Sequence, residues 1–127
     1  MFKALVIPVK GPVYEIQVGA DGGDLATLQD AVGGWIEAVP IPPFVEGRER
    51  ATAYINEEGK YACRNEDGTV AVNMRATDFM VPGVGLHFGD FIAGPMVLAG
   101  FDMSTGEQAE LPQAVEDRVR LIEKEAA

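Results

Sequence analysis

Apolar and polar positions at the start of the chain follow the two-residue period of β-strands. Residues 2–9 are apolar almost throughout, which is typical of a central strand. Residues 13–18 alternate between apolar and polar side chains, which predicts one packed and one solvated face. Gly11-Pro12 separates the two runs and predicts a turn between them.

The next segment has the spacing of a helix. Leu25, Leu28 and Val32 recur at intervals of three and four residues. Asp24 precedes them as an N-cap whose carboxylate can accept hydrogen bonds from the free amides of the first turn. Gly33-Gly34 ends the helix, because glycine adopts the left-handed conformation without steric cost.

Short strands separated by turns fill the middle of the chain. Prolines at 40, 42 and 43 predict a loop to about residue 50. Residues 75–80 favour one helical turn, and the apolar run at 91–101 favours a strand that is kinked at Gly94-Pro95. Short β-rich runs predict further strands at 35–41, 51–55, 60–63 and 69–72. The polar residues between them predict turns at 56–59 and 65–68.

The end of the chain has the pattern of a short amphipathic helix. Pro112 suits a first helical position, and an apolar stripe follows at Val115, Val119 and Ile122. Such a helix can dock on the body, join two copies of the chain or fray. We therefore expect a single mostly-β globular domain at 1–111 and a C-terminal amphipathic helix at 112–127. The predicted class is α+β, with a small, mostly antiparallel curved sheet or partial barrel, one internal helix and one C-terminal helix.

Composition restricts the class of protein more than its reaction. The 127 residues are enough for one domain, and 47% of them are apolar, which is enough for a core. Cys63 is the only cysteine, so no internal disulfide forms, and the apolar run near the N-terminus is interrupted by Pro8. We therefore expect a cytoplasmic protein. The net charge of −10 repels nucleic-acid phosphates and anionic membranes, so we expect direct binding to neither.

Residues for catalysis or metal binding are scarce. His87 and Ser104 are each the only residue of their type, and no nucleophile elbow surrounds the serine. A Cys63–His87 pair, or Glu37 with Asp78 as acid and base, stays open as an alternative, but no spacing selects either. A zinc site needs three or four histidine and cysteine ligands, and the chain has two such residues. The sequence therefore favours a protein that is not an enzyme and that carries no metal or cofactor.

The polar turns have the composition of ion sites but not their spacing. The acidic turns at 19–24 and 65–68 lack the twelve-residue pattern of a calcium loop. The glycine-rich segment 83–89 matches neither phosphate-binding fingerprint. The first acidic turn lies between a strand and a helix, where anions can bind, but Asp21 and Asp24 occupy that place. We interpret all three segments as ordinary turns.

One group of polar and aromatic residues is a candidate ligand-binding site. Its members are Trp35, Tyr54, Asn56, Asn73 and Arg75. Amide and guanidinium groups can hold a ligand carboxylate or phosphate, and aromatic rings can close the pocket. The alternative is structural: the aromatic rings pack in the core, and the arginine pairs with Glu57 or Asp78 as a buried strut, because buried charges are normally paired.

Four segments together are familiar. They are KALVIPV at 3–9, LQDAVGGWIE at 28–37, NEEGK at 56–60 and NMRAT at 73–77. With these segments in this order, the chain resembles the family catalogued as domain of unknown function 3846, found in bacteriophages, mobile elements and actinobacteria. The resemblance covers about residues 3–101 and leaves the C-terminal helix peripheral. It implies a setting rather than a reaction, namely a short cytoplasmic accessory protein, since the family has no agreed activity.

The sequence as a whole favours a non-enzymatic binding protein. It would serve as a phage or mobile-element accessory or counter-defence factor that binds a host protein or sequesters a small anionic, nucleotide-like ligand. Two alternatives stay open. One is an acidic mimic of nucleic acid that inhibits a DNA-binding host protein. The other is a structural or assembly protein whose C-terminal helix joins protomers into a homodimer or higher oligomer.

Overall fold

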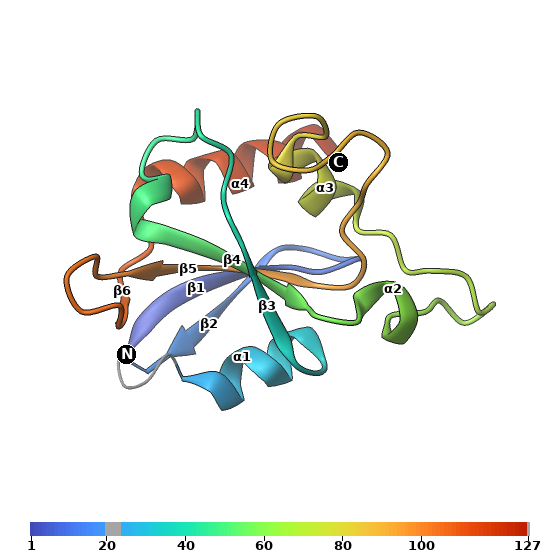
Figure 1. The fold of residues 1–127 in the computed structure, drawn as a ribbon, viewed down its shortest axis with the longest axis horizontal. Helices are drawn as coiled ribbons and strands as arrows, with labels where there is room; N and C mark the ends of the chain where they lie inside the picture. Colours follow the sequence, from blue (N-terminus) through green and yellow to red (C-terminus); the bar gives the residue numbers. More distant parts are fainter. Residues whose placement is uncertain (20–23, 127) are drawn as a thin grey trace.

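A six-stranded antiparallel sheet forms the middle of the molecule (Figure 1). This computed structural model describes residues 1–19 and 24–126. The order in the sheet is β2-β1-β5-β4-β3, and β6 pairs with the end of β5. Its strands are β1 (Phe2–Ile7), β2 (Tyr14–Val18), β3 (Ile36–Val39), β4 (Ala51–Asn56), β5 (Met96–Phe101) and β6 (Gln108–Ala109).

Helices cover both faces of the sheet. In Figure 1, α1 (Leu25–Val32) lies below the sheet, and α3 (Met74–Met80) and α4 (Gln113–Ala126) lie above it. A short helix α2 (Gly59–Ala62) follows β4, and a 3₁₀ turn η2 (Arg48–Arg50) precedes β4. The α+β class with a mostly antiparallel sheet is confirmed. Among the described residues the sheet stays open rather than closing into a barrel. The helical turn expected at 75–80 is present as α3, and α2 adds a helix that was not expected.

The alternation of side chains along the strands builds two cores. On β1, Leu5 and Ile7 pack on the α3 and α4 side, whereas Ala4 and Val6 pack on the α1 side. All four are almost completely buried. The central strands β1 and β5 therefore carry apolar residues on both faces, which explains their nearly continuous apolar sequences.

The strand β5 joins two hairpins that are far apart in the sequence. β1 pairs with β2 and β3 pairs with β4, and β5 lies between β1 and β4. Leu98 of β5 is opposite Leu5 on one side and Ala53 on the other. The chain therefore leaves the sheet after β4, forms α2, α3 and a long loop, and returns to fill the centre.

The predicted hairpin at residues 60–63 is wrong, because this segment forms the helix α2. β4 already has β3 and β5 as neighbours, so no free edge remains for a strand that folds back on it. The strand expected at 69–72 is reduced to isolated bridges, Arg64 with Val70 and Val72 with Ala93. The turn at 65–68 is confirmed, and Gly68 has the positive φ of 85° that such a turn requires.

The helix at 25–32 is confirmed, but its N-terminus is held differently from the expectation. The Asp24 carboxylate does not make the backbone cap bond that was expected. It accepts hydrogen bonds from the Gly19 amide at 2.6 Å and the Thr27 hydroxyl at 3.0 Å, and these bonds lower the pKa of Asp24. Gly33 ends the helix with a φ of 81°, as predicted. The rest of the polar loop, residues 20–23, lies outside the described residues.

The apolar face of α4 packs against the body of the molecule. Val115 and Val119 are buried and Ile122 is partly buried in the same core as β1 and β5. Arg118 donates from Nη2 to the Phe79 carbonyl at 3.1 Å, which joins α4 to α3. Within residues 1–19 and 24–126, no helix combines the length and apolar character that a membrane-spanning segment requires.

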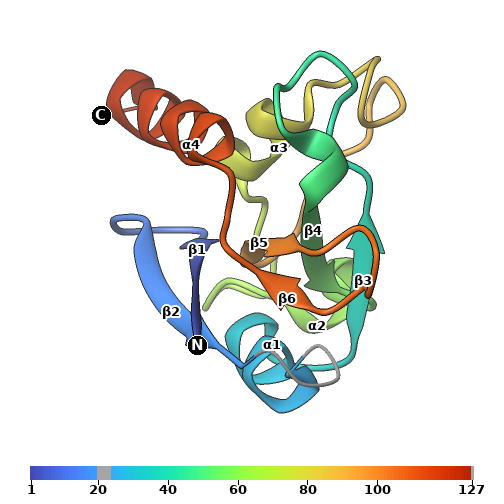
Figure 2. The same ribbon diagram turned by 90° about the vertical axis from the view of Figure 1, so that its left-hand side faces the viewer.

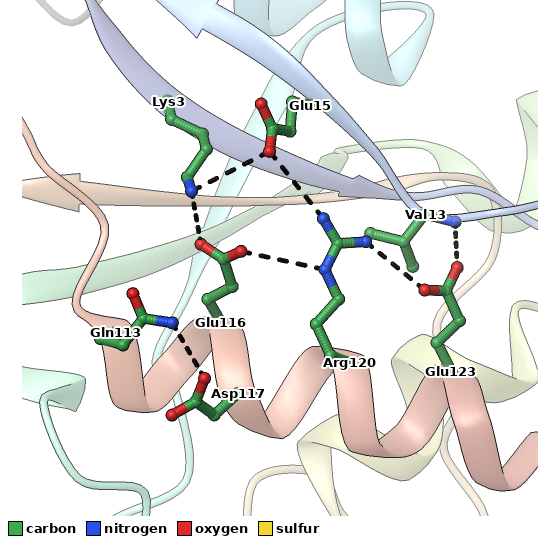
Figure 3. A network of polar contacts seen from close by, with 8 residues as sticks. All are labelled: Lys3, Val13, Glu15, Gln113, Glu116, Asp117, Arg120 and Glu123. Carbon is green, nitrogen blue, oxygen red and sulfur yellow. Dashed lines mark hydrogen bonds and ion pairs between the residues drawn. The ribbon is translucent and has the colours of Figure 1, made fainter.

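Charged side chains tie α4 to the first hairpin (Figure 3). Lys3 Nζ lies 2.7 Å from Glu116 Oε1, and the Val13 amide donates to Glu123 at 2.5 Å. Arg120 lies among three carboxylates, those of Glu15, Glu116 and Glu123. The helix is thus fixed to β1 and β2 by polar contacts as well as by its apolar stripe.

Candidate functional site

A cleft of about 560 Å³ opens beside the ends of β3 and β4. Three parts of the chain form its walls, which brings together residues that are far apart in sequence. They are Glu37 and Val39 of β3 with residues 55–58 at the end of β4, the start of α2 at 59–61, and the loop residues 83–88 and 90–93.

The floor of the cleft is apolar and fixed to the core. Val39 and Ile55 face the α3 and α4 side of the sheet, and with Leu86 they are partly buried against the core on that side. Ile92 is almost completely buried beneath them. Because core side chains hold this floor in place, the cleft is largely formed before any ligand arrives.

The rim of the cleft has a surplus of negative charge. Its carboxylates are Glu37, Glu57, Glu58 and Asp90, and its only lysine is Lys60. The ammonium group of Lys60 forms an ion pair with Asp90. The pKa of Asp90 is lowered first by the hydrogen bond from Lys60 and then by the hydrogen bond from the Phe91 amide. Among the ion pairs of the described residues, none includes the three glutamates, so their charge is not neutralised internally.

Exposed aromatic rings stand on the same rim. Tyr61 is 81% exposed and Phe88 is 86% exposed, although both line the cleft. The ring of Phe88 lies over Gly83, which has a φ of 92°, and a Cβ at that glycine would come within 2.5 Å of the ring. Large apolar side chains held on a surface in this way are typical of contact sites.

Of the five predicted site residues, Asn56 is the one that lines this cleft. Its Nδ2 donates to the Val32 carbonyl at 3.2 Å, and its Oδ1 accepts from the Glu58 amide at 2.8 Å. Trp35 is 69% exposed just before β3, and it is not part of the lining. Tyr54 points to the opposite face and packs in the core beneath α1.

Asn73 is completely buried and bonded to the backbone on every side. Its Nδ2 donates to the Ile7 carbonyl at 2.8 Å and to the Gly94 carbonyl at 2.9 Å. Its Oδ1 accepts from the Ala76 amide at 3.0 Å and caps α3. The side chain therefore joins β1, the start of β5 and α3, and it uses its donors and its acceptor to do so.

Arg75 is partly buried and bonds to the main chain. Its Nη2 donates to the Pro8 carbonyl at 2.7 Å. The strut was expected to end on Glu57 or Asp78, and this is wrong, because a backbone carbonyl takes the place of the carboxylate. The five predicted residues thus do not share one cavity.

The alternative catalytic pairs are also separated. Cys63 lines a second hollow of about 720 Å³ together with Lys10 and Arg64, whereas His87 lines the cleft. Burial raises the pKa of the Cys63 thiol, which disfavours the nucleophilic thiolate. Glu37 belongs to the cleft but Asp78 does not.

The remaining candidates have local structural contacts. Ser104 donates its hydroxyl to Asp102 at 2.6 Å in the turn between β5 and β6. In the part of the chain that the structure describes, no three histidine, cysteine or acidic residues are placed to hold a metal ion.

The sequence interpretation missed most of the cleft. Its residues lie in segments that had been assigned as turns, namely Glu57 and Glu58 after β4 and the glycine-rich loop around His87 and Phe88. A local signal was present, because the loop at 83–89 places large apolar side chains between glycines where no strand or helix can bury them. The proximity of this loop to β4 was not readable from the sequence.

The comparisons with known proteins identify a family and no function. The model of a family described as a domain of unknown function (DUF3846) matches residues 2–124, so the chain belongs to that family. The match extends beyond residue 101, where the resemblance was expected to end, and it includes most of α4. No curated protein and no solved structure matches the chain.

Proposed function

We propose that this DUF3846 protein is a non-enzymatic binding protein that holds a basic segment of a partner protein in the cleft beside β3 and β4. The observation that carries the proposal is an apolar floor combined with rim glutamates that form no ion pair within the described residues. Lysine and arginine side chains complement such a rim, and their aliphatic stems can cover apolar surface.

The charge of the cleft favours a protein partner over a small anionic ligand. A phosphate or carboxylate would enter beside Glu37, Glu57 and Glu58, and its only local cation, Lys60, is already paired with Asp90. Of the groups expected to hold an anion, Asn73 Nδ2 and Arg75 Nη2 donate to backbone carbonyls instead.

The phage or mobile-element setting that the family resemblance implies is part of the same proposal. Proteins of phages and mobile elements commonly act on the cell that they enter. This supports an accessory or counter-defence factor whose partner is a host protein with a basic, partly apolar segment.

A selection from displayed random peptides tests the proposal. Glu57→Lys with Glu58→Lys reverses two charges on the rim, and Asp30→Lys with Glu46→Lys makes the same change in charge at exposed positions outside the cleft. Peptides enriched on the parent protein should carry lysine or arginine. They should bind the cleft variant at least about tenfold more weakly, and the control variant as well as the parent, because close charge pairs at an interface contribute more than about 1.4 kcal/mol.

Two results would overturn the proposal. One is enrichment of acidic peptides, or of peptides that bind both double variants equally. The other is a rise in the melting temperature that nucleotides cause and the selected peptides do not. This rise would have to persist in the variant with Glu57→Lys and Glu58→Lys. A melting curve of each variant confirms that it is folded before binding is compared.

A further inference from the structure

The edge strand β3 has backbone groups that no strand in the described part of the chain uses. Within residues 1–19 and 24–126, β3 pairs only with β4, and Figure 2 shows β2 and β3 at opposite edges of the sheet. The Glu57 amide donates to the Trp35 carbonyl at 2.8 Å, which places position 35 in a hydrogen-bonded pair with β4. Because successive residues of a strand direct their backbone groups to opposite sides, the amides and carbonyls of Ile36 and Ala38 point outward.

The outward groups of β3 lie directly beside the cleft. Glu37 and Val39, which alternate with the two outward-facing positions, both have side chains in the cleft lining. A strand added to β3 would therefore direct every second side chain over the same face, next to the apolar floor and the acidic rim.

The other edge of the sheet is protected. The Glu123 carboxylate of α4 takes the amide of Val13, just before β2, and Glu15 of β2 lies in ion-pairing range of Lys3 and Arg120 (Figure 3). Charged side chains and a covering helix are common ways to block an edge strand. Figure 2 shows α4 on the β2 side of the sheet, away from β3.

We infer that the partner segment binds as an additional antiparallel strand on β3, with a lysine or arginine opposite Glu37 and an apolar residue opposite Val39. This inference rests on the proposed function and specifies its ligand, a peptide with a basic and an apolar side chain two residues apart. In an antiparallel arrangement both positions form non-hydrogen-bonded pairs with β3, where Cα atoms approach to about 4.5 Å and side chains contact most closely.

The short length of β3 fits this division of roles. The two outward-facing residues of β3, Ile36 and Ala38, offer two amides and two carbonyls. Pro40, which follows the strand, has no backbone amide hydrogen to donate. Backbone bonds would set the direction and register of the segment, and side chains in the cleft would give most of the affinity.

Synthetic peptides test the register. The first has an arginine and a valine two residues apart, and the control has the same composition with these two residues adjacent. Trp35 is the only tryptophan and comes just before β3, so its emission reports binding at this edge. The first peptide should bind at least about tenfold more tightly, since a shift of one residue moves one of the two side chains away from the cleft.

Backbone changes test the strand itself. N-methylation of the peptide residue opposite Ala38 removes an inward hydrogen bond, whereas N-methylation of the residue opposite Glu37 changes an amide that points to solvent. The first change should weaken binding by about tenfold, and the second by less than about twofold. In the protein, Ala38→Pro should reproduce the loss, because it removes an outward amide and leaves the β4 ladder intact, and Ala38→Val should not.

The charge pair gives a third measurement. Glu37→Lys should lose the arginine peptide and bind the same peptide with glutamate in place of arginine. Equal effects of the two N-methylations, together with normal binding to Ala38→Pro, would overturn strand addition. If Glu57→Lys with Glu58→Lys still abolished binding in that case, the proposed function would stand without this inference. If that double variant bound as well as the parent, both would fail.

Discussion

The variant Asn73→Asp replaces one buried amide group by a carboxyl group of nearly the same shape. The Nδ2 of Asn73 donates to two carbonyls, those of Ile7 and Gly94, and a carboxylate would place negative charge against both. The oxygen that accepts from the Ala76 amide is kept, so the cap of α3 survives. The perturbation is therefore confined to the two donated bonds.

The expected loss can be worked out from these contacts. Each buried carbonyl left without its donor costs about 1–3 kcal/mol, so the ionised variant should be less stable by about 3–5 kcal/mol once its own burial is included. A typical stability of about 0.05–0.15 kcal/mol per residue gives this 127-residue chain about 6–19 kcal/mol. The variant should still fold at neutral pH, but with a large part of its stability lost.

The pH dependence identifies the cause. A buried carboxyl group facing two carbonyls has its pKa raised above the ordinary value of about 3.9, and its protonated form can restore one donated bond. A carboxyl group whose pKa is raised in the folded state stabilises the fold while it is protonated. This stabilisation is complete below the pKa of the unfolded chain and is lost as the pH rises through the pKa of the folded protein. The gap between Asn73→Asp and the parent should therefore widen from pH 5 to pH 7.5, with a slope of up to about 1.4 kcal/mol per pH unit.

Urea unfolding followed by far-UV circular dichroism measures this gap. Asn65→Asp is the control, because Asn65 lies in a turn and donates to Thr69 Oγ1 and the Val70 carbonyl near the surface. Its loss should be small and independent of pH over the same range. The reasoning would be refuted if Asn73→Asp differed from the parent by less than about 0.5 kcal/mol at pH 7.5, or if the gap did not change with pH.

Three further changes test other contacts. Gly94→Ala should cost about 2–4 kcal/mol in urea unfolding, because Gly94 has a φ of 80° and a Cβ there would lie 2.4 Å from Cys63 Sγ. Adding Cys63→Ala should recover part of that loss, and no recovery would count against the contact. Asp24→Ala should destabilise the protein at neutral pH. Hydrogen bonds lower the folded-state pKa of Asp24 from 3.8, so the difference in stability between the parent and this variant should fade below that pH. An undiminished difference at pH 2.5 would contradict this account of Asp24. Arg118→Met should keep or raise the melting temperature, because burial lowers the pKa of Arg118 and its Nε has no partner among the described residues. A clear drop would show that the hydrogen bond to the Phe79 carbonyl and the contacts with the Phe44 and Phe79 rings matter more.

Local patterns in the sequence were sufficient for most elements. β1, β2, α1, β4 and α4 were predicted because each carries its own period or end signal, such as Gly33 after α1. The segment 60–63 could not be predicted in the same way. Its conformation depends on which strands already flank β4, and this is decided by β5, more than thirty residues later in the chain.

The candidate site was less predictable than the fold, for a related reason. The cleft forms where β3, the end of β4 and the loop at 83–93 meet, and no single segment carries its pattern. The buried role of Asn73 and the structural role of Arg75 fit their residue types. Their acceptors are backbone carbonyls, which every residue has, so the sequence could not single out Ile7, Gly94 or Pro8.

The position of β5 determines when the sheet can be completed during synthesis. Until Met96–Phe101 has left the ribosome, the nascent chain contains two hairpins with no hydrogen-bonded strand between them. Translation at about 5–20 residues per second leaves these hairpins unjoined for seconds, with the edges of β1 and β4 open to other chains. Cooperative folding of this protein must therefore wait for nearly the whole polypeptide, and a ribosome stalled before Met96 would hold a chain that is prone to aggregate.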